Sequence, residues 1–134
     1  MVEYSDSIQN ITSDNLQGFF VGWQNTPTPE IHIKLLQHSD YKIVAKEGEK
    51  VVGFITAITD GTLAAYIPFL EVLPEYQKQG IGKELVGQML EKLKGFYMID
   101  LLCDAELQHF YEQLGMQKAT GMMKRNYDKQ SGLK

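Results

Sequence analysis

One stretch, residues 72–85, decides the fold, and it reads Val72-Leu73-Pro74-Glu75-Tyr76-Gln77-Lys78-Gln79-Gly80-Ile81-Gly82-Lys83-Glu84-Leu85. An apolar strand pattern ends at Pro74, a short polar loop follows, and a helical pattern begins at the two glycines. The first amides of a helix have no partner within it and lie at the positive end of its dipole. Glycine leaves such amides open to close approach. The stretch therefore predicts an anion site, with pyrophosphate as its natural occupant.

Two other kinds of phosphate loop are excluded by the same residues. The sequence has no GxxxxGK(S/T) motif, and the GxGxxG fingerprint is incomplete because Leu85 stands where its last glycine belongs. A simpler interpretation stays open at this point, in which the glycines only allow a tight turn between a strand and a helix.

On the N-terminal side of this stretch, hydrophobic spacing predicts a strand, two helices and three antiparallel strands. Ser13 is a candidate cap for the first helix and Thr28 for the second. Pro68 predicts a bulge in the last of these strands, because proline cannot donate a ladder hydrogen bond. The expected ranges are 2–5, 13–23, 28–38, 41–47, 51–59 and 63–72.

On the C-terminal side, a helix from Gly82 to Gly95 is followed by a strand over 96–103. Asp104 can cap a further helix, which Gly115 ends. The segments 116–119 and 122–126 are expected to pair as a last hairpin, and 127–134 to be a frayed tail. The whole chain is predicted to be one mixed α/β domain, residues 1–134, with a mostly antiparallel central sheet and about four helices.

Composition narrows the class of protein. The 134 residues suit one domain, and a net charge of -4 with scattered lysines and arginines argues against nucleic acid as a partner. A mildly acidic protein is compatible with a cationic amine substrate. The single cysteine, Cys103, expected to be a buried strand residue, suits the reducing cytoplasm. We found no signal peptide, no apolar run of membrane-spanning length and no metal motif.

The residues 70–82 resemble the acetyl-coenzyme A signature of the GNAT superfamily of N-acetyltransferases, (R/Q)-x-x-G-x-(G/A). Downstream, Phe110-Tyr111-Glu112-Gln113-Leu114-Gly115-Met116 is similar to the second motif of that superfamily, F-Y-x-x-x-G-F, with Met116 in place of the last Phe. The order of elements matches the superfamily over nearly the whole chain. The resemblance implies a sheet that splays apart at the cofactor site.

The resemblance also implies how acetyl-coenzyme A binds. The loop amides of Gln77, Lys78, Gln79, Gly80, Ile81 and Gly82 would hold the pyrophosphate, with Lys78 and Lys83 adding positive charge. The pantetheine arm would lie along the backbone of Leu70 and Val72. Asp104 stands where many members have an asparagine that places this arm, and a simple helix cap is the alternative.

Two residues are candidates for proton transfer. Tyr111 holds the motif position that in many members protonates the departing thiolate, and a core aromatic is the alternative interpretation. Glu71 is the only carboxylate in an otherwise apolar strand, which makes it a candidate general base. Its alternative is a structural role, facing a helix end or a lysine.

The resemblance implies an acceptor pocket between the first two helices and the centre of the sheet. Trp23, Tyr66 and Tyr97 could line it, whereas Phe19 and Phe20 are expected to pack in the core. The three histidines, His32, His38 and His109, are expected at the surface.

Together these features predict an acetyl-coenzyme A-dependent N-acetyltransferase. It would act on a primary amine of a small molecule or peptide, by direct attack in a ternary complex. The alternative is a non-catalytic acyl-coenzyme A sensor or interaction module of the same fold. The oligomeric state stays open, although this superfamily often forms homodimers.

Overall fold

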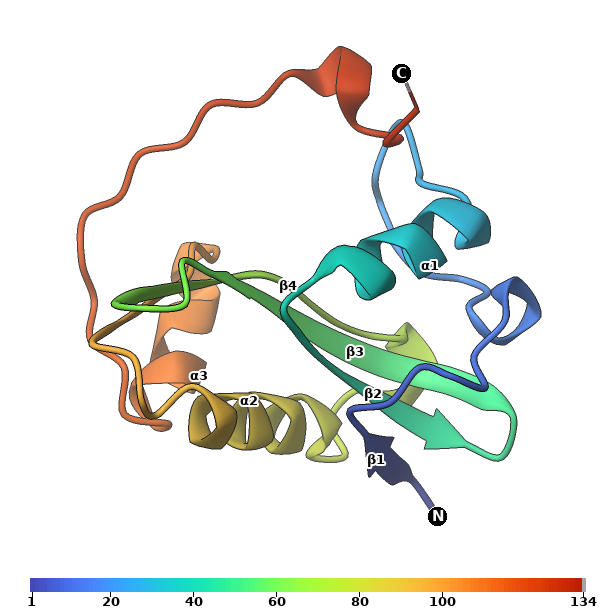
Figure 1. The fold of residues 1–134 in the computed structure, drawn as a ribbon, viewed down its shortest axis with the longest axis horizontal. Coiled ribbons are helices and arrows are strands. Elements are labelled where there is room, and N and C mark those ends of the chain that lie inside the picture. Colours follow the sequence, from blue (N-terminus) through green and yellow to red (C-terminus); the bar gives the residue numbers. More distant parts are fainter. Residues whose placement is uncertain (134) are drawn as a thin grey trace.

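The structure, a computed structural model, describes residues 1–133 and is built around one five-stranded sheet (Figure 1). The strands are β1 (Glu3–Ser5), β2 (Tyr41–Glu47), β3 (Lys50–Thr59), β4 (Ala64–Val72) and β5 (Met98–Asp100), and they lie in the sheet in chain order. β1 to β4 pair antiparallel, and β5 runs parallel to β4. The mostly antiparallel sheet of a single mixed α/β domain is therefore confirmed.

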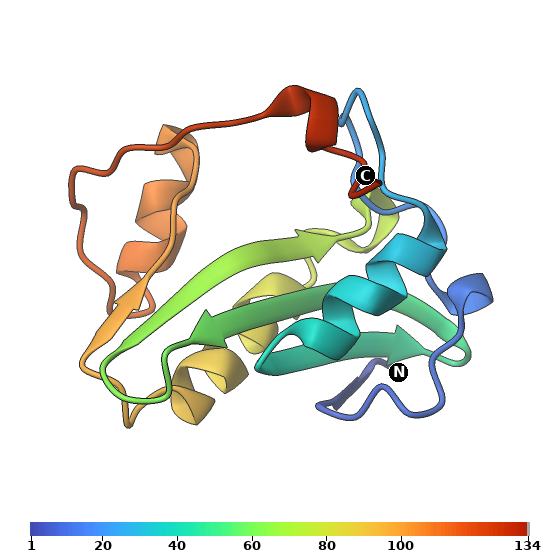
Figure 2. The same cartoon turned by 45° about the horizontal axis from the view of Figure 1, so that its top comes forward.

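Helices cover the sheet on its two faces (Figure 2). α1 (Pro29–His38) lies on one face, and α2 (Ile81–Lys92) lies on the other, with α3 (Gln108–Glu112) beside it. Alternate strand residues point to opposite faces, so neighbouring residues of β3 enter different cores. Val51 and Phe54 pack with Leu36 of α1, whereas Val52 and Ile55 pack with Leu85 and its neighbours in α2. β3 is consequently buried on both sides and forms the centre of the molecule.

The best predicted elements are those with clear local signals. Thr28 caps α1 by accepting a hydrogen bond from the Ile31 amide (3.2 Å), and Pro29 is its first residue. Across the Asp60-Gly61 turn, one carboxylate oxygen of Asp60 accepts hydrogen bonds from the amides of Thr62, Leu63 and Ala64. These hydrogen bonds lower the pKa of the Asp60 carboxyl, so the turn between β3 and β4 is held by a charged group.

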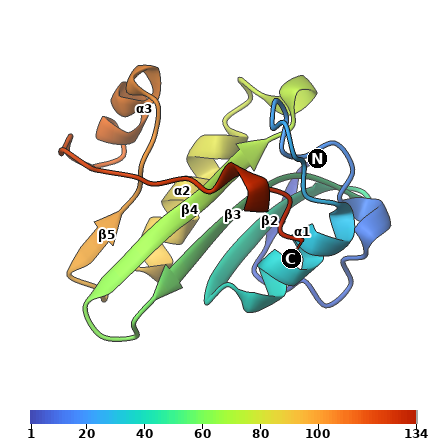
Figure 3. The same ribbon diagram turned by 90° about the horizontal axis from the view of Figure 1, so that it is seen from above.

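The sheet splays apart between β4 and β5 (Figure 3). β4 and β5 pair only where Ala64–Tyr66 meets Met98–Asp100, and β4 then continues to Val72 paired with β3 alone. The pairing of β3 with β4 shifts register between Thr56 and Ile58, opposite Pro68, as the proline predicted. The expected splay is therefore present, and it leaves one edge of β4 without a neighbouring strand among residues 1–133.

The prediction of a helix over residues 13–23 is wrong. Only Ser13–Asn15 forms a turn of 3₁₀ helix, and the chain then turns with left-handed backbone at Gly18 (φ 92°), Phe20 (φ 63°) and Gly22 (φ 84°). Left-handed residues cannot continue a right-handed helix. The described residues consequently contain three α-helices rather than about four.

The C-terminal elements also differ from expectation. The strand predicted over 96–103 is confined to β5, and the following helix is a 3₁₀ turn, Ala105–Leu107, that leads into α3. The predicted hairpin over 116–126 does not form. The tail has a 3₁₀ turn at Tyr127–Lys129, and Asn25 holds it through hydrogen bonds to the Tyr127 carbonyl (3.2 Å) and the Gln130 side chain (2.9 Å). Lys134 lies outside the described residues.

Candidate functional site

The loop between β4 and α2 presents unpaired amides at the start of a helix. Lys78 (φ 65°) and Gly80 (φ 87°) both have left-handed backbone, which turns the chain sharply into α2. The first helical hydrogen bond runs from the Glu84 amide to the Gly80 carbonyl (3.0 Å). Within the described part of the chain, the amides of residues 78–83 donate to no acceptor. These donors gather at the positive end of the α2 dipole, which is the arrangement that binds phosphate groups.

Side chains hold the loop in this shape. The Gln77 side-chain amide donates to the Val72 carbonyl (2.9 Å), which ties the loop back to the end of β4. The Gln79 side chain makes a longer contact with the Glu75 carbonyl (3.5 Å). Both glutamines therefore order the loop, while Lys78 and Lys83 are exposed and bring positive charge to it.

The open edge of β4 carries free backbone groups beside the loop. The Leu73 amide donates to the Val52 carbonyl of β3 (2.9 Å). Backbone groups along a strand point alternately to its two neighbours, so the amides of Leu70 and Val72 point away from β3. These two amides face the side of β4 where β5 no longer pairs with it. An extended ligand could pair there as an additional strand would.

Tyr111 lies on the α2 side of the splay. Its ring is buried in the core that contains Leu85 and Met89, and burial raises the pKa of its phenol to about 12, with a smaller contribution from Cys103. The neighbouring Phe110 ring is 5.0 Å from that of Tyr111 and lies beside Gly82, where an added Cβ would be 3.9 Å from it. Phe110 is therefore adjacent to the start of α2, so the second motif lies against the first, with Tyr111 next to this contact.

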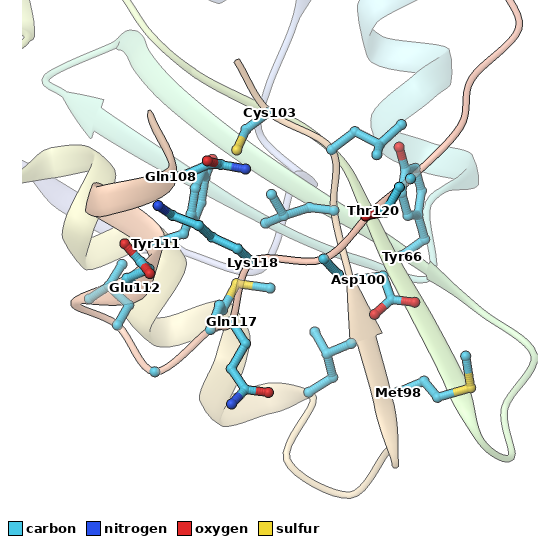
Figure 4. Close-up of a pocket in the computed structure, with 18 of the residues that line it drawn as sticks. Tyr66, Met98, Asp100, Cys103, Gln108, Tyr111, Glu112, Gln117, Lys118 and Thr120 are labelled. Atoms are coloured by element: carbon cyan, nitrogen blue, oxygen red, sulfur yellow. The ribbon is translucent and has the colours of Figure 1, made fainter. Parts of the chain in front are cut away.

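An open cavity of about 1470 Å³ lies over Tyr111 (Figure 4). Cys103 and Gln108 line it next to the Tyr111 ring, and Tyr66 and Asp100 line its far side. Cys103 is half-buried and follows β5 rather than lying in a strand, and burial raises the pKa of its thiol. Sequence reasoning missed Gln108, although it precedes Tyr111 by three residues and helical spacing places both on one face.

Glu71 lies on the opposite face, in the part of β4 that faces α1. Its two carboxylate oxygens accept hydrogen bonds from the amides of Phe20 (2.8 Å) and Val21 (3.2 Å). These amides belong to the left-handed turn that replaces the predicted helix. Glu71 thus holds this turn against the sheet, and its structural interpretation gains support.

The predicted acceptor residues do not come together. Trp23 packs against Phe20 (4.9 Å between rings) and Phe69 (6.3 Å) on the α1 side. Tyr66 and Tyr97 line the large cavity instead, and Tyr97 is 84% exposed. Phe19 and Phe20 are buried, as expected.

The structure also shows where the three histidines and Asp104 lie. His32 was expected at the surface, but it is only 1% exposed and packs among Phe19, Phe20 and Phe54. His38 and His109 are exposed, as predicted. Asp104 precedes the 3₁₀ turn at Ala105–Leu107, and its side chain makes no cap hydrogen bond.

Residues 1–133 contain no group of three or more side chains able to hold a metal ion. Among the helices formed by these residues, none has the length and apolar character needed to cross a bilayer.

A family model, solved structures and curated proteins described as acetyltransferases all resemble this chain. The model of the acetyltransferase (GNAT) family matches residues 8–116. A crystal structure of a candidate acetyltransferase from Deinococcus radiodurans R1 superposes with a TM-score of 0.96 at 39% identity, covering 99% of this chain and 94% of that one. A GNAT-family acetyltransferase from Streptococcus pneumoniae TIGR4 superposes with a TM-score of 0.77 at 30% identity, covering 94% of this chain and 98% of that one.

Among curated proteins, the uncharacterised N-acetyltransferase ycf52 from Pyropia yezoensis is 29% identical over 86% of this chain and 70% of its own length. The chain spans about half the length of several other curated relatives that it matches.

Proposed function

Because the chain belongs to the GNAT acetyltransferase family, we propose that it transfers an acetyl group from acetyl-coenzyme A to a primary amine. The acceptor would be a small molecule or a peptide, and the amine would attack directly in a ternary complex. The reducing cytoplasm is the compartment that the single cysteine suggests.

The observation that supports this proposal most strongly is the set of unpaired amides at residues 78–83. They fit the pyrophosphate of coenzyme A because they are donors, cluster at a helix start and are open to solvent at Gly80, where an added Cβ would meet nothing within 4 Å. Lys78 and Lys83 add charge of the right sign. The outward amides of Leu70 and Val72 fit the amide-containing pantetheine arm.

When bound, acetyl-coenzyme A would supply an activated acetyl thioester. Tyr111 would donate a hydrogen bond to the departing sulfur. Its phenol, with a pKa of about 12, stays protonated at neutral pH. An ordinary thiol has a pKa of roughly 8.5, so complete proton transfer would be uphill. A buried thiolate is more basic, however, and burial near Tyr111 already raises the pKa of Cys103. Tyr111 would therefore act chiefly by stabilising the thiolate with its proton.

Glu71 is the proposed base, or the residue that orders a water acting as base. It lies on the α1 face, whereas Tyr111 lies on the α2 face. The proposal requires that the two faces meet where β4 and β5 separate, so that acid and base act on opposite sides of one bound thioester. Trp23, near Glu71, would contact the acceptor from the α1 side, and Tyr66 and Tyr97 from the cavity.

One feature supports the non-catalytic alternative, a sensor that binds acyl-coenzyme A. Both oxygens of Glu71 already accept amide hydrogen bonds, which reduces its capacity to accept a proton. A thiol-release assay with acetyl-coenzyme A and a panel of amines, polyamines, amino acids and peptides separates the two functions. Coenzyme A binding without turnover on any acceptor would favour the sensor.

A pair of helix glycines provides the test of the cofactor site. Gly82 lies at the start of α2 with ordinary backbone, and an added Cβ would stay 3.8 Å from Val72. Gly82→Glu places negative charge against the bound pyrophosphate, and we expect coenzyme A affinity to fall at least about tenfold, or ~1.4 kcal/mol.

Gly87→Glu is the matched control, since it adds the same charge to an exposed position of the same helix, where an added Cβ meets nothing within 4 Å. Isothermal titration with coenzyme A measures both variants. Equal affinities would remove the basis of the proposal.

A further inference from the structure

Asp100 is a charged residue in a short strand, and no contact within residues 1–133 explains it. It ends β5, where its neighbour Ile99 packs into the core on the α2 side. Successive strand residues point to opposite faces, so the Asp100 side chain points to the α1 side. Aspartate is disfavoured in strands. Its carboxylate forms no ion pair and accepts no hydrogen bond in the described part of the chain, so it is available to a ligand.

Asp100 lies where the sheet divides. Its partner in register is Tyr66, which forms the last pair between β4 and β5. Figure 4 shows the two side chains together on one side of the cavity over Tyr111. In the proposed function, the pantetheine arm runs past Val72 and Leu70 toward this fork. Leu70 is roughly 13 Å further along β4 than Tyr66, from the usual rise per strand residue. An acceptor that meets the thioester near Leu70 can therefore extend back to Asp100.

A polar group at the other end of this cavity also lacks a partner. Tyr111 is 9% exposed, and among residues 1–133 its hydroxyl has no hydrogen-bond partner. Such a buried group costs free energy until a ligand or water completes its hydrogen bonds. Figure 4 shows Lys118 near Tyr111 and away from Asp100, so it does not neutralise that carboxylate. The cavity therefore offers a hydroxyl at one end and an uncompensated negative charge at the other.

A smaller cavity of about 360 Å³ adjoins the large one at Tyr66 and Asp100. Its described lining contains two carboxylates and no lysine, arginine or histidine. Backbone amides lower the pKa of the Asp60 carboxyl, so this group is ionised at neutral pH. The Tyr66 ring can attract a cation to its face, and Ile58 offers apolar contact to methylene groups. An alkylammonium group matches this combination. The lining residues are Ile58, Thr59, Asp60, Ala64, Ala65, Tyr66 and Asp100.

This negative site suits a nitrogen other than the one that is acetylated. An amine must be uncharged to attack the thioester, whereas a carboxylate favours the charged form of any amine that it binds. We propose that Asp100 determines specificity by binding a second ammonium group of the acceptor, which makes diamines and polyamines the preferred substrates. This inference rests on the proposed acetyl transfer.

The nitrogen at the opposite end of the acceptor takes part in the reaction. It enters uncharged, forms the C–N bond with the acetyl carbon as the C–S bond breaks, and gives up one proton to Glu71 or to water. The thiolate leaves next to the Tyr111 hydroxyl. The ammonium group at Asp100 keeps its proton throughout, so it contributes to binding and orientation and not to bond making.

Pairs of acceptors that differ by one amine test this proposal. Diaminobutane is compared with butylamine, diaminohexane with hexylamine and diaminooctane with octylamine, in a thiol-release assay with saturating acetyl-coenzyme A. For the wild type we expect a kcat/KM at least about tenfold higher for the diamine of the best pair, after correction for its equivalent amines, because hydrogen bonds between charged groups are strong. Asp100→Asn should bring this ratio close to one, mainly by raising the KM for the diamine.

Glu106→Gln is the matched control, since it removes the same charge from an exposed position of the 3₁₀ turn after β5. Asp100→Glu keeps the charge and should keep part of the preference. Isothermal titration with coenzyme A checks that each variant is folded and binds the cofactor. Asp100→Ser, a second neutral variant, gives the same comparison should Asp100→Asn fail this check.

The possible results separate this inference from the function on which it rests. A wild type with no preference for diamines, or neutral variants with the wild-type preference, would overturn the role of Asp100 and leave acetyl transfer to amines intact. Coenzyme A binding without turnover of any amine would instead overturn the acetyl-transfer proposal, and this inference with it.

Discussion

Tyr111 combines a buried ring with a hydroxyl that reaches the cavity and has no hydrogen-bond partner among residues 1–133. Tyr111→Phe should therefore leave the melting temperature nearly unchanged. If the phenol assists departure of the thiolate, the maximal rate should fall by at least about tenfold, at the lower end of general acid catalysis because water can substitute.

Steady-state kinetics and calorimetry separate this loss of rate from cofactor binding. Tyr41→Phe is the control, since Tyr41 is half-buried against Phe96 away from the cavity. A wild-type rate for Tyr111→Phe, in an assay limited by chemistry, would leave Tyr111 a core aromatic. Because the pKa of Tyr111 is about 12, its ionisation should not limit the rate below pH 10.

Glu71 carries two possible roles that one substitution can distinguish. Glu71→Gln replaces an acceptor oxygen by an NH₂ group, which would face the amide of Phe20 or Val21. Leaving one amide without its acceptor should cost ~1–3 kcal/mol and lower the melting temperature by several degrees.

If Glu71 is also the base, the rate at saturating substrates should fall beyond any change in folded fraction, most strongly at low pH. Calorimetric melting and a pH-rate profile measure the two effects. Glu75→Gln, at an exposed position, is the control. An unchanged melting temperature would contradict the structural role, and an unchanged profile the catalytic one.

The contact between β3 and α2 depends on Gly53. An added Cβ at this position would lie 3.2 Å from the Glu71 carbonyl and 3.2 Å from the Leu85 side chain. Gly53→Ala should push α2 away from the sheet and cost ~1–3 kcal/mol, as overpacking of a core does. Gly87→Ala, on the solvent side of the same helix, should instead stabilise by up to ~1 kcal/mol. Chemical denaturation measures both, and a stabilised Gly53→Ala would show that the two elements separate freely.

Elements with local signals could be predicted from the sequence. Thr28 and Pro29 mark the start of α1, and the apolar stripe of Ile81, Leu85 and Met89 marks α2. The segment 13–23 has an equally good apolar spacing, yet it turns at Gly18, Phe20 and Gly22. Its conformation depends on Glu71, about 50 residues away in sequence, and no local pattern contains that contact.

In the candidate site, too, the parts that depend on local sequence could be predicted and the parts that depend on long-range contacts could not. Its loop lies within one stretch of sequence, so the amides at residues 78–83 could be placed in advance. Trp23 and Tyr97 were grouped only by their aromatic character, and they lie on different sides of the molecule because the sheet separates them. The hairpin over 116–126 failed for a related reason: Asn25 holds the chain beyond it, at Tyr127.

The stability of the whole molecule should depend on pH through His32. Burial lowers the pKa of this histidine to about 4, from an ordinary value of about 6.5, and neither ring nitrogen has a partner in the described residues. Between pH 6.5 and 4, His32 binds a proton in the unfolded chain but stays neutral in the folded chain. The free energy of unfolding should therefore fall as pH falls through this window, by on the order of 3 kcal/mol in total.

His32→Leu removes the titrating group and both unpaired nitrogens, so its stability should lose this part of the pH dependence. His38→Leu, at an exposed position of the same helix, should keep it. Urea denaturation at a series of pH values from 7 to 4.5 makes the comparison. Parallel curves for wild type and His32→Leu would show that water reaches the buried ring.

Residues 117–125 are exposed and make no hydrogen bond within residues 1–133, and this has a consequence for the lifetime of the protein. Proteases bind their substrates as extended chains, and an exposed segment without hydrogen bonds needs no local unfolding to enter such a cleft. Lys118, Lys124 and Arg125 are all cleavage sites for trypsin-like enzymes. A cut there would not release the tail at once, because Asn25 still holds Tyr127 and Gln130. A molecule cut at one of these residues would consequently keep its sheet and its C-terminal fragment. It would lose only the covalent connection between α3 and the turn that Asn25 holds.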